Sequence, residues 1–109
     1  MPTRLRNALA IAFLAGAVVG ANAAATITVV QRGLVLNKSS LTVAKGDRVV
    51  FNNEDDVIHN IHIFGPGDYE KDLGLQKPGV PLSYIFDYVG DYKVRCNIHP
   101  SIKTAVAVK

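Results

Sequence analysis

The chain has 109 residues, of which 49% are hydrophobic and 19% are charged, with 9 Gly and 5 Pro. This composition excludes disordered and collagen-like chains and indicates one globular domain. Lys and Arg number 12 against 9 Asp and Glu, but Arg4 and Arg6 lie in the N-terminal leader described next. The remainder is nearly neutral, which argues against a nucleic-acid binder, because phosphate binding needs a clustered excess of Lys and Arg.

Residues 1–25 have the pattern of a secretory signal peptide. A basic start at residues 1–7 precedes an apolar run at residues 8–20 and small residues that offer cleavage after Ala23 or Ala25. The apolar run is shorter than the roughly 20 residues that span a bilayer, so no stable membrane insertion is expected. The domain is therefore assigned to residues 26–109, and the exported protein to the periplasm.

Short β-branched and aromatic runs recur after residue 25, separated by Gly, Asn, Asp and Pro, and no long segment has helical periodicity. The chain is therefore predicted to be all-β, a Greek-key antiparallel β-sandwich of about seven to eight strands. The polar connection at residues 65–81 is expected to be a surface excursion between the sheets. The candidate strands are residues 26–31, 34–36, 41–43, 48–52, 58–64, 82–88, 92–96 and 104–108.

Alternation along three of these strands predicts which side chains face the core. In the strand at residues 58–64, the inward set is His59, Ile61 and Ile63. In the strand at residues 92–96, it is Tyr92, Val94 and Cys96. In the strand at residues 82–88, it is Leu82, Tyr84, Phe86 and Tyr88. His62 has the opposite parity to His59 and is expected to be exposed to solvent.

Cys96 is the single cysteine of the chain, so it has no partner for an intramolecular disulfide. A free thiol in an oxidising compartment is prone to oxidation, which suggests that something protects or uses it. A loop after Cys96 can turn the thiol and the His99 imidazole toward one point. His59, on the inward face of another strand, is the candidate third donor. One thiolate and two imidazoles are the equatorial donor set of blue-copper electron-transfer centres.

Other roles for these residues are also open. Taken singly, Cys96 fits a buried inert thiol, and His59 and His99 fit structural histidines. Zinc accepts the same donors, but a structural zinc site needs a fourth ligand and Ile102 offers none. A Cys/His nucleophilic enzyme is not expected, because no oxyanion hole or substrate cleft is identified.

The chain resembles the cupredoxins, specifically the small plastocyanin, amicyanin and pseudoazurin group. The resemblance covers nearly the whole mature chain. It is carried in order by SLTVAKGD at residues 40–47, VFNN at residues 50–53 leading to His59, and GDYKV at residues 90–94 leading to Cys96 and His99. It implies one mononuclear copper ion bound by His59, Cys96 and His99, both imidazoles through Nδ1. It also implies that Asn60 hydrogen-bonds between the two ligand-bearing loops.

The chain departs from these relatives at the fourth ligand. Relatives with the short amicyanin-like spacing have an axial Met three residues after the second His, and this chain has Ile102 there. The only Met of the chain is Met1. An apolar axial residue should raise the reduction potential, since a weak axial donor stabilises Cu(II) more than Cu(I). Both a three-coordinate site and a distant axial oxygen from the Ile58 carbonyl remain open.

The resemblance implies a periplasmic type 1 copper protein that carries single electrons between redox partners and is not an enzyme. Electrons are expected to pass near the edge of His99, and docking to redox proteins to be weak and transient. A monomer is the expected state. The alternative is a protein for copper storage or delivery, which the missing axial ligand favours. The acidic residues Glu54, Asp55 and Asp56 are expected to form a solvated turn, close enough to His59 to bias docking.

Overall fold

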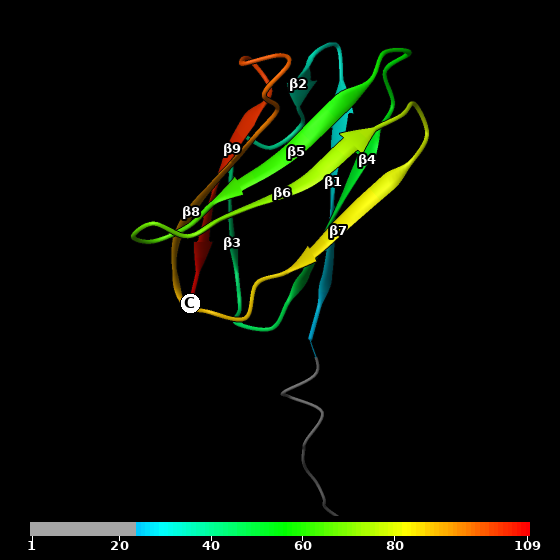
Figure 1. Cartoon of the computed structure of the whole chain (residues 1–109). Coiled ribbons are helices and arrows are strands. Elements are labelled where there is room, and N and C mark those ends of the chain that lie inside the picture. The colour runs from blue at the N-terminus through cyan, green and yellow to red at the C-terminus, as the bar shows by residue number, and fades with distance from the viewer. Residues whose placement is uncertain (1–23) are drawn as a thin grey trace, which may run out of the picture.

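A computed structural model describes residues 24–109, so nearly all of the predicted signal peptide lies outside the described residues. Residues 24–109 form nine strands and no helix (Figure 1), which confirms the all-β prediction. Among these residues there is no candidate transmembrane helix. The strands are β1 (Thr26–Arg32), β2 (Val35–Leu36), β3 (Ser40–Val43), β4 (Arg48–Asn53), β5 (His59–Phe64), β6 (Glu70–Gln76), β7 (Pro81–Ile85), β8 (Gly90–Arg95) and β9 (Lys103–Val108).

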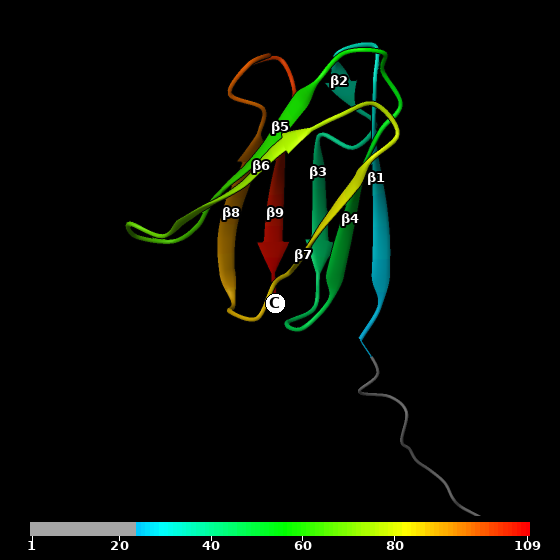
Figure 2. The ribbon, with the colours of Figure 1, turned by 45° about the vertical axis from the view of Figure 1, so that its right-hand side comes forward.

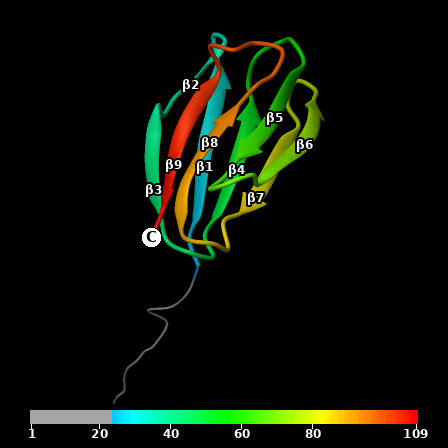
Figure 3. The same ribbon diagram turned by 60° about the vertical axis from the view of Figure 1, so that its left-hand side comes forward.

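The strands form two layers that pack face to face, which Figure 2 and Figure 3 show from two sides. One sheet has four strands in the order β2-β1-β4-β7, and the other has five in the order β3-β9-β8-β5-β6. The chain passes repeatedly between the layers, because β3, β5 and β8 each follow a strand of the other sheet. The predicted β-sandwich is therefore confirmed.

Two strand pairs are parallel, which differs from the predicted antiparallel sandwich. Strands β1 and β4 run parallel, with Val29 opposite Phe51, and so do β3 and β9, with Leu41 opposite Val106. The other pairs are antiparallel. Each parallel pair joins segments separated by at least one strand of the opposite layer, so no hairpin sets their relative direction.

Strand β6 lies within the segment that was predicted to be a surface excursion. It pairs antiparallel with β5, with a register shift between Ile61 and His62, and it forms an edge of the five-stranded sheet. Its sequence EKDLGLQ is poor in the β-branched and aromatic residues that mark strands. Charged residues are typical of exposed edge strands, where they discourage pairing with other molecules.

Strand β7 ends at Ile85, three residues before the predicted end. Phe86 is buried as predicted, but Tyr88 is 77% exposed. The backbone of Phe86 binds the turn before β4: its N–H donates to the Asp47 carbonyl at 3.0 Å, and its carbonyl accepts from the Gly46 N–H at 2.7 Å. With its backbone bound to this turn, Phe86 no longer pairs in the sheet, and Tyr88 lies beyond the end of the strand.

The core lies between the two sheets, and the buried donor side chains of His59 and Cys96 lie at one end of it. The predicted inward residues of β5 and those at and just after β8 are all buried. The largest apolar side chains that are fully buried are Phe51, Phe86, Ile61, Ile63 and Ile102. His59 and Cys96 are equally buried, so the apolar packing holds two of the three predicted donors in place.

Candidate metal centre

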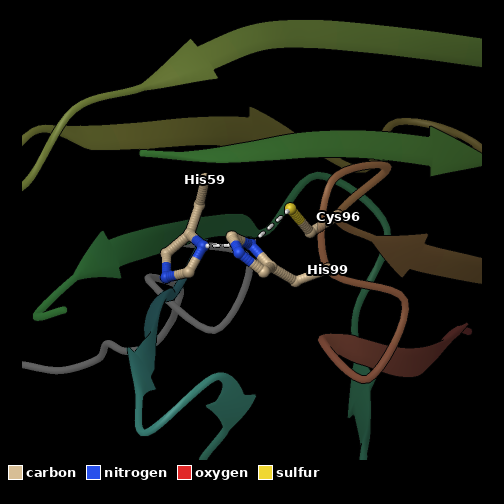
Figure 4. A group of neighbouring side chains, drawn as sticks. All are labelled: His59, Cys96 and His99. Carbon is tan, nitrogen blue, oxygen red and sulfur yellow. Dashed lines mark hydrogen bonds between the residues drawn. The ribbon is translucent and has the colours of Figure 1, made fainter. Parts of the chain in front are cut away.

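The three predicted donors meet at one end of the sandwich (Figure 4). His59 begins β5, Cys96 directly follows β8, and His99 lies in the loop between β8 and β9. The Nδ1 atoms of the two histidines are 3.2 Å apart, and the Cys96 Sγ lies 3.8 Å from the His99 Nδ1. All three donor atoms lie within 4.8 Å of one another. The fold thus brings together residues that are distant in sequence.

The loop that carries Cys96 and His99 is closed by its own backbone. The Cys96 N–H donates to the Ile102 carbonyl at 2.9 Å, and the Ile102 N–H donates to the His99 carbonyl at 2.9 Å. The loop joins two antiparallel strands, whose last pair is Arg95 opposite Lys103. This short closed connection keeps the thiol and the imidazole on the same side of the loop.

Asp55 determines how the His59 ring presents its nitrogens. The Asp55 Oδ2 lies 2.7 Å from the His59 Nε2. Because an ionised carboxylate only accepts hydrogen bonds, Nε2 carries the proton of the neutral ring and Nδ1 keeps its lone pair. That lone pair is directed at the donor group, as metal binding through Nδ1 requires.

Asp55 is itself held by the turn between β1 and β2. Its Oδ1 accepts from the Gly33 N–H at 2.6 Å and its Oδ2 from the Leu34 N–H at 3.2 Å. Both turn residues have positive φ, 68° and 60°, so their successive N–H groups form a concave anion-binding site. Burial raises the pKa of Asp55, but the hydrogen bonds from His59, Gly33 and Leu34 outweigh this effect and lower the pKa below its ordinary value.

The prediction of a solvated acidic turn is wrong for Asp55. Its side chain is only 12% exposed, whereas Glu54 and Asp56 are exposed. Nothing local distinguishes Asp55 from its two acidic neighbours. The distinguishing contacts come from the β1–β2 turn, which is remote in sequence, so sequence reasoning missed this residue.

Asn60 connects the segments that carry the donors. Its backbone N–H donates to the Cys96 Sγ at 3.3 Å, and its side-chain Oδ1 accepts from the Asn97 N–H at 3.0 Å. Its Nδ2 donates to the Asp72 Oδ1 at 2.7 Å and to the Gly74 carbonyl at 3.2 Å. Asn60 therefore ties the loop after β8 to both β5 and β6.

The donor set suits a copper ion. Separations of 3.2 and 3.8 Å between donor atoms are spanned by one ion with bonds of about 2.0–2.3 Å to nitrogen and sulfur. A thiolate suits Cu(I), and imidazole suits both oxidation states. His59 and Cys96 are fully buried, while His99 is half-buried, so only one donor residue reaches the surface.

Ile102 closes the donor loop and contributes no ligand atom from its side chain. It is fully buried. Within residues 24–109, the group of potential metal ligands comprises only His59, Cys96 and His99. The fourth position of the group therefore has no His, Cys, Asp or Glu to fill it.

His62 lies on the face opposite His59, as predicted, but it is not fully exposed. Its side chain is 13% exposed and stacks on Phe64 at 4.2 Å between ring centroids. Its Nε2 lies 2.8 Å from the Glu70 Oε1, and its Nδ1 lies 2.8 Å from the Asn97 Nδ2. Part of the surface of His62 is covered by Glu70 of β6, a strand that was not predicted from the sequence.

Comparison with known sequences gives one partial similarity. No family model matches the chain. Methylamine utilization protein MauL of Methylophilus methylotrophus is 31% identical over 65 residues, which are 58% of this chain and 37% of that protein. The match thus spans little more than a third of the length of this relative.

Solved structures of amicyanin share the fold. An oxidised variant has a TM-score of 0.70 at 26% identity, with 77% of this chain and 82% of that chain covered. A Cu(I) form of a second variant has a TM-score of 0.69 at 26% identity over the same shares. A reduced Cu(I) form of a third, at pH 4, has a TM-score of 0.70 at 26% identity, with 82% and 85% covered.

Proposed function

The chain is a cupredoxin, similar in fold to amicyanin, and we propose that it is a type 1 copper protein that carries single electrons between redox partners. The observation that carries the proposal is the convergence of the His59 Nδ1, the Cys96 Sγ and the His99 Nδ1 at one end of the sandwich. These residues would hold one copper ion, which supplies the one-electron chemistry.

The rigidity of the donor group favours electron transfer over copper exchange. Asp55 fixes His59, Asn60 binds both Cys96 and Asn97, and backbone hydrogen bonds close the loop around His99. A site that rearranges little between oxidation states has a low barrier to gaining or losing an electron. Two fully buried donors also slow the release of a metal to a chelator.

His99 is the proposed point of electron exchange with partners. It is the only one of the three donors that is not fully buried. The next residues on either side, Ile98 and Pro100, are exposed, and Ser101 binds the carbonyl of the exposed Leu34 at 2.9 Å. A small apolar surface of this kind suits weak, transient docking between redox proteins.

We further propose that the protein works in the periplasm and has no enzymatic activity. The signal-peptide pattern of residues 1–25 supports export. In a catalytic metal site, substrate must reach an open coordination position, whereas two of these donors are fully buried in the core and only His99 reaches the surface. The proposed copper site is three-coordinate, since Ile102 is buried and has no donor atom in its side chain.

The visible absorption spectrum tests the proposed function. The protein, with Cys96 fully reduced, is titrated with Cu(II). We expect an intense thiolate-to-copper band toward the red end of the visible, which disappears and returns with mild reductant and oxidant. Cys96→Ala should abolish the band and most of the copper affinity. Val106→Ala, which also shortens a buried side chain but lies outside the donor group, should keep the band.

A different result would assign the copper to another role. If the protein binds only Cu(I), stays colourless with oxidant and loses the metal readily to a chelator, electron transfer is rejected. The function would then be copper storage or delivery.

A further inference from the structure

Positive charge gathers on the outer face of β8 and β9. Lys93 and Arg95 on β8 and Lys103 on β9 are exposed, and their neighbours Val94 and Thr104 are buried. Because side chains alternate between the two faces of a strand, the three basic side chains point away from the core. Lys93, Arg95 and Lys103 are here named the basic face. The strands that carry it lie side by side in Figure 3.

The register of β8 and β9 places like charges against each other. Arg95 lies directly opposite Lys103, and Lys93 lies opposite Ala105, diagonal to Lys103. Like charges directly opposite on one face of an antiparallel pair destabilise the sheet. None of the ion pairs within residues 24–109 includes a residue of the basic face. No ion pair within this part of the chain therefore offsets the repulsion, and an anionic partner would do so.

Beside these charges the surface is hollowed. An open hollow of about 590 Å³ is lined by the basic face, by the segment that leads into β3, and by the end of the donor loop. Its apolar lining includes Val35, Leu36 and Ala105, and Ser39 and Ser101 add hydroxyl groups. Apolar surface bordered by charged and polar groups is the usual composition of a protein–protein interface.

Acidic residues on β6 are engaged elsewhere, whereas Asp91 on β8 is exposed on the same outer face as Lys93 and offsets part of the positive charge at that end of the strand. Glu70 on β6 lies 2.8 Å from the His62 Nε2. Asp72 accepts from the Asn60 side chain at 2.7 Å and from the Gly74 N–H at 2.7 Å. Strand β5 separates β6 from β8, a distance of about 10 Å between their backbones. At that distance, physiological salt screens most of the attraction between exposed charges.

We propose that the basic face is a docking surface for the acidic surface of a protein partner. Opposite charges speed the encounter of two proteins and orient it. The face lies next to the donor group, because Arg95 directly precedes Cys96 and Lys103 directly follows Ile102. The identification of this partner as a redox protein rests on the proposed function.

Poly-L-glutamate serves as the probe of the basic face. Its binding is followed by backbone amide chemical shifts of the isotope-labelled protein. We expect shifts concentrated at residues 93–95 and 103–105, lost at high salt and absent with poly-L-lysine. Shifts concentrated elsewhere on the surface would overturn the proposal.

A matched pair of double variants separates a local surface from overall charge. Lys93→Gln/Lys103→Gln leaves Arg95 on the Phe64 ring, 4.5 Å from its centroid, and should weaken binding by about tenfold. Lys45→Gln/Lys77→Gln removes the same charge from exposed positions outside the basic face and should leave binding almost unchanged. Equal weakening in both variants would overturn the proposal, since it would show a response to net charge alone.

Two further results distinguish this inference from the proposed function. Analytical sedimentation measures whether the protein forms a reversible dimer. A dimer that is lost in Lys93→Gln/Lys103→Gln would overturn the proposal and assign the basic face to a second copy of the chain. Amide shifts report docking independently of copper chemistry. If the protein has the visible band but shows no amide shifts at the basic face, only the docking proposal is contradicted. Shifts without the band would support an acidic partner and reject a redox role for it.

Discussion

Asp55 influences the proposed copper site without supplying a ligand. Its carboxylate binds the His59 Nε2 at 2.7 Å and is held by the N–H groups of Gly33 and Leu34. Its lowered pKa keeps it ionised at neutral pH. A carboxylate bound to the remote nitrogen of a ligating imidazole makes the ring a stronger donor, which favours Cu(II) over Cu(I).

Asp55→Asn removes this charge while the amide oxygen still accepts from Nε2. We expect Cu(II) affinity to fall by about tenfold. If Cu(I) affinity is unchanged, the reduction potential rises by about 60 mV, the equivalent of a tenfold change in a one-electron equilibrium. Potentiometric titration measures the shift, and Asp56→Asn, at an exposed neighbouring position, is the control. A potential equal to that of the parent would show that the Asp55 charge does not reach the metal.

Ile102 is the residue that sets this chain apart from relatives with an axial Met. Ile102→Met introduces a thioether, a weak axial donor that stabilises Cu(II), so the reduction potential should fall by about 60 mV or more. Ile102→Leu keeps the volume and the apolar character and should leave the potential nearly unchanged. Equal potentials in the Met and Leu variants would show that the side chain at residue 102 does not occupy the axial position.

Among the elements, the turn before β4 connects to the segments beside β1, β3 and β7 through one residue, Asp47. The Asp47 Oδ1 accepts from the Ala25 N–H before β1 at 2.9 Å, and its Oδ2 accepts from the Ala44 N–H after β3 at 2.8 Å. Its carbonyl accepts from Phe86 after β7. The hydrogen bonds from Ala25 and Ala44 lower the pKa of Asp47, and the opposing effect of burial is smaller.

This lowered pKa predicts how the stability depends on pH. Because the folded-state pKa lies below the unfolded value, the unfolded chain binds more protons as the pH falls. The stabilisation is complete above the unfolded pKa and is lost as the pH falls through the folded one. Asp47→Asn should therefore destabilise the fold at neutral pH, and its difference from the parent should be smaller at about pH 3, below the unfolded pKa. Urea unfolding at both pH values measures the difference, and a difference independent of pH would contradict the prediction.

At the scale of the whole molecule, the two predicted cleavage positions leave the fold with different numbers of hydrogen bonds at its N-terminus. Ala25 gives its N–H to Asp47 at 2.9 Å, and its carbonyl accepts from the Arg48 N–H at 2.9 Å. Cleavage after Ala25 would remove both hydrogen bonds, whereas cleavage after Ala23 would keep them. We expect the exported protein to begin at Ala24, which its intact mass measures. A mass that corresponds to a start at Thr26 would contradict this prediction.

Local alternation in the sequence was sufficient to predict most strands and their buried faces. The inward positions of His59, Ile61 and Ile63, and of Val94 and Cys96, all follow from period-two patterning, and all are buried in the structure. The candidate donors were also few, because the chain has 1 Cys and 3 His. Such predictions succeed because a strand with one buried face alternates apolar and polar residues, and this alternation can be read from adjacent positions in the sequence.

Contacts between distant segments decided the remaining features. Such contacts set the parallel pairing of β1 with β4 and the position of the polar edge strand β6. They also set the hydrogen bonds between Asp55 and the β1–β2 turn and the placement of Arg95 opposite Lys103. A strand's own sequence does not determine which strand pairs with it or in which direction. The sequence by itself determined the β class and the candidate donors. The tertiary structure alone decided how these donors meet and which charges face one another, because both depend on long-range packing.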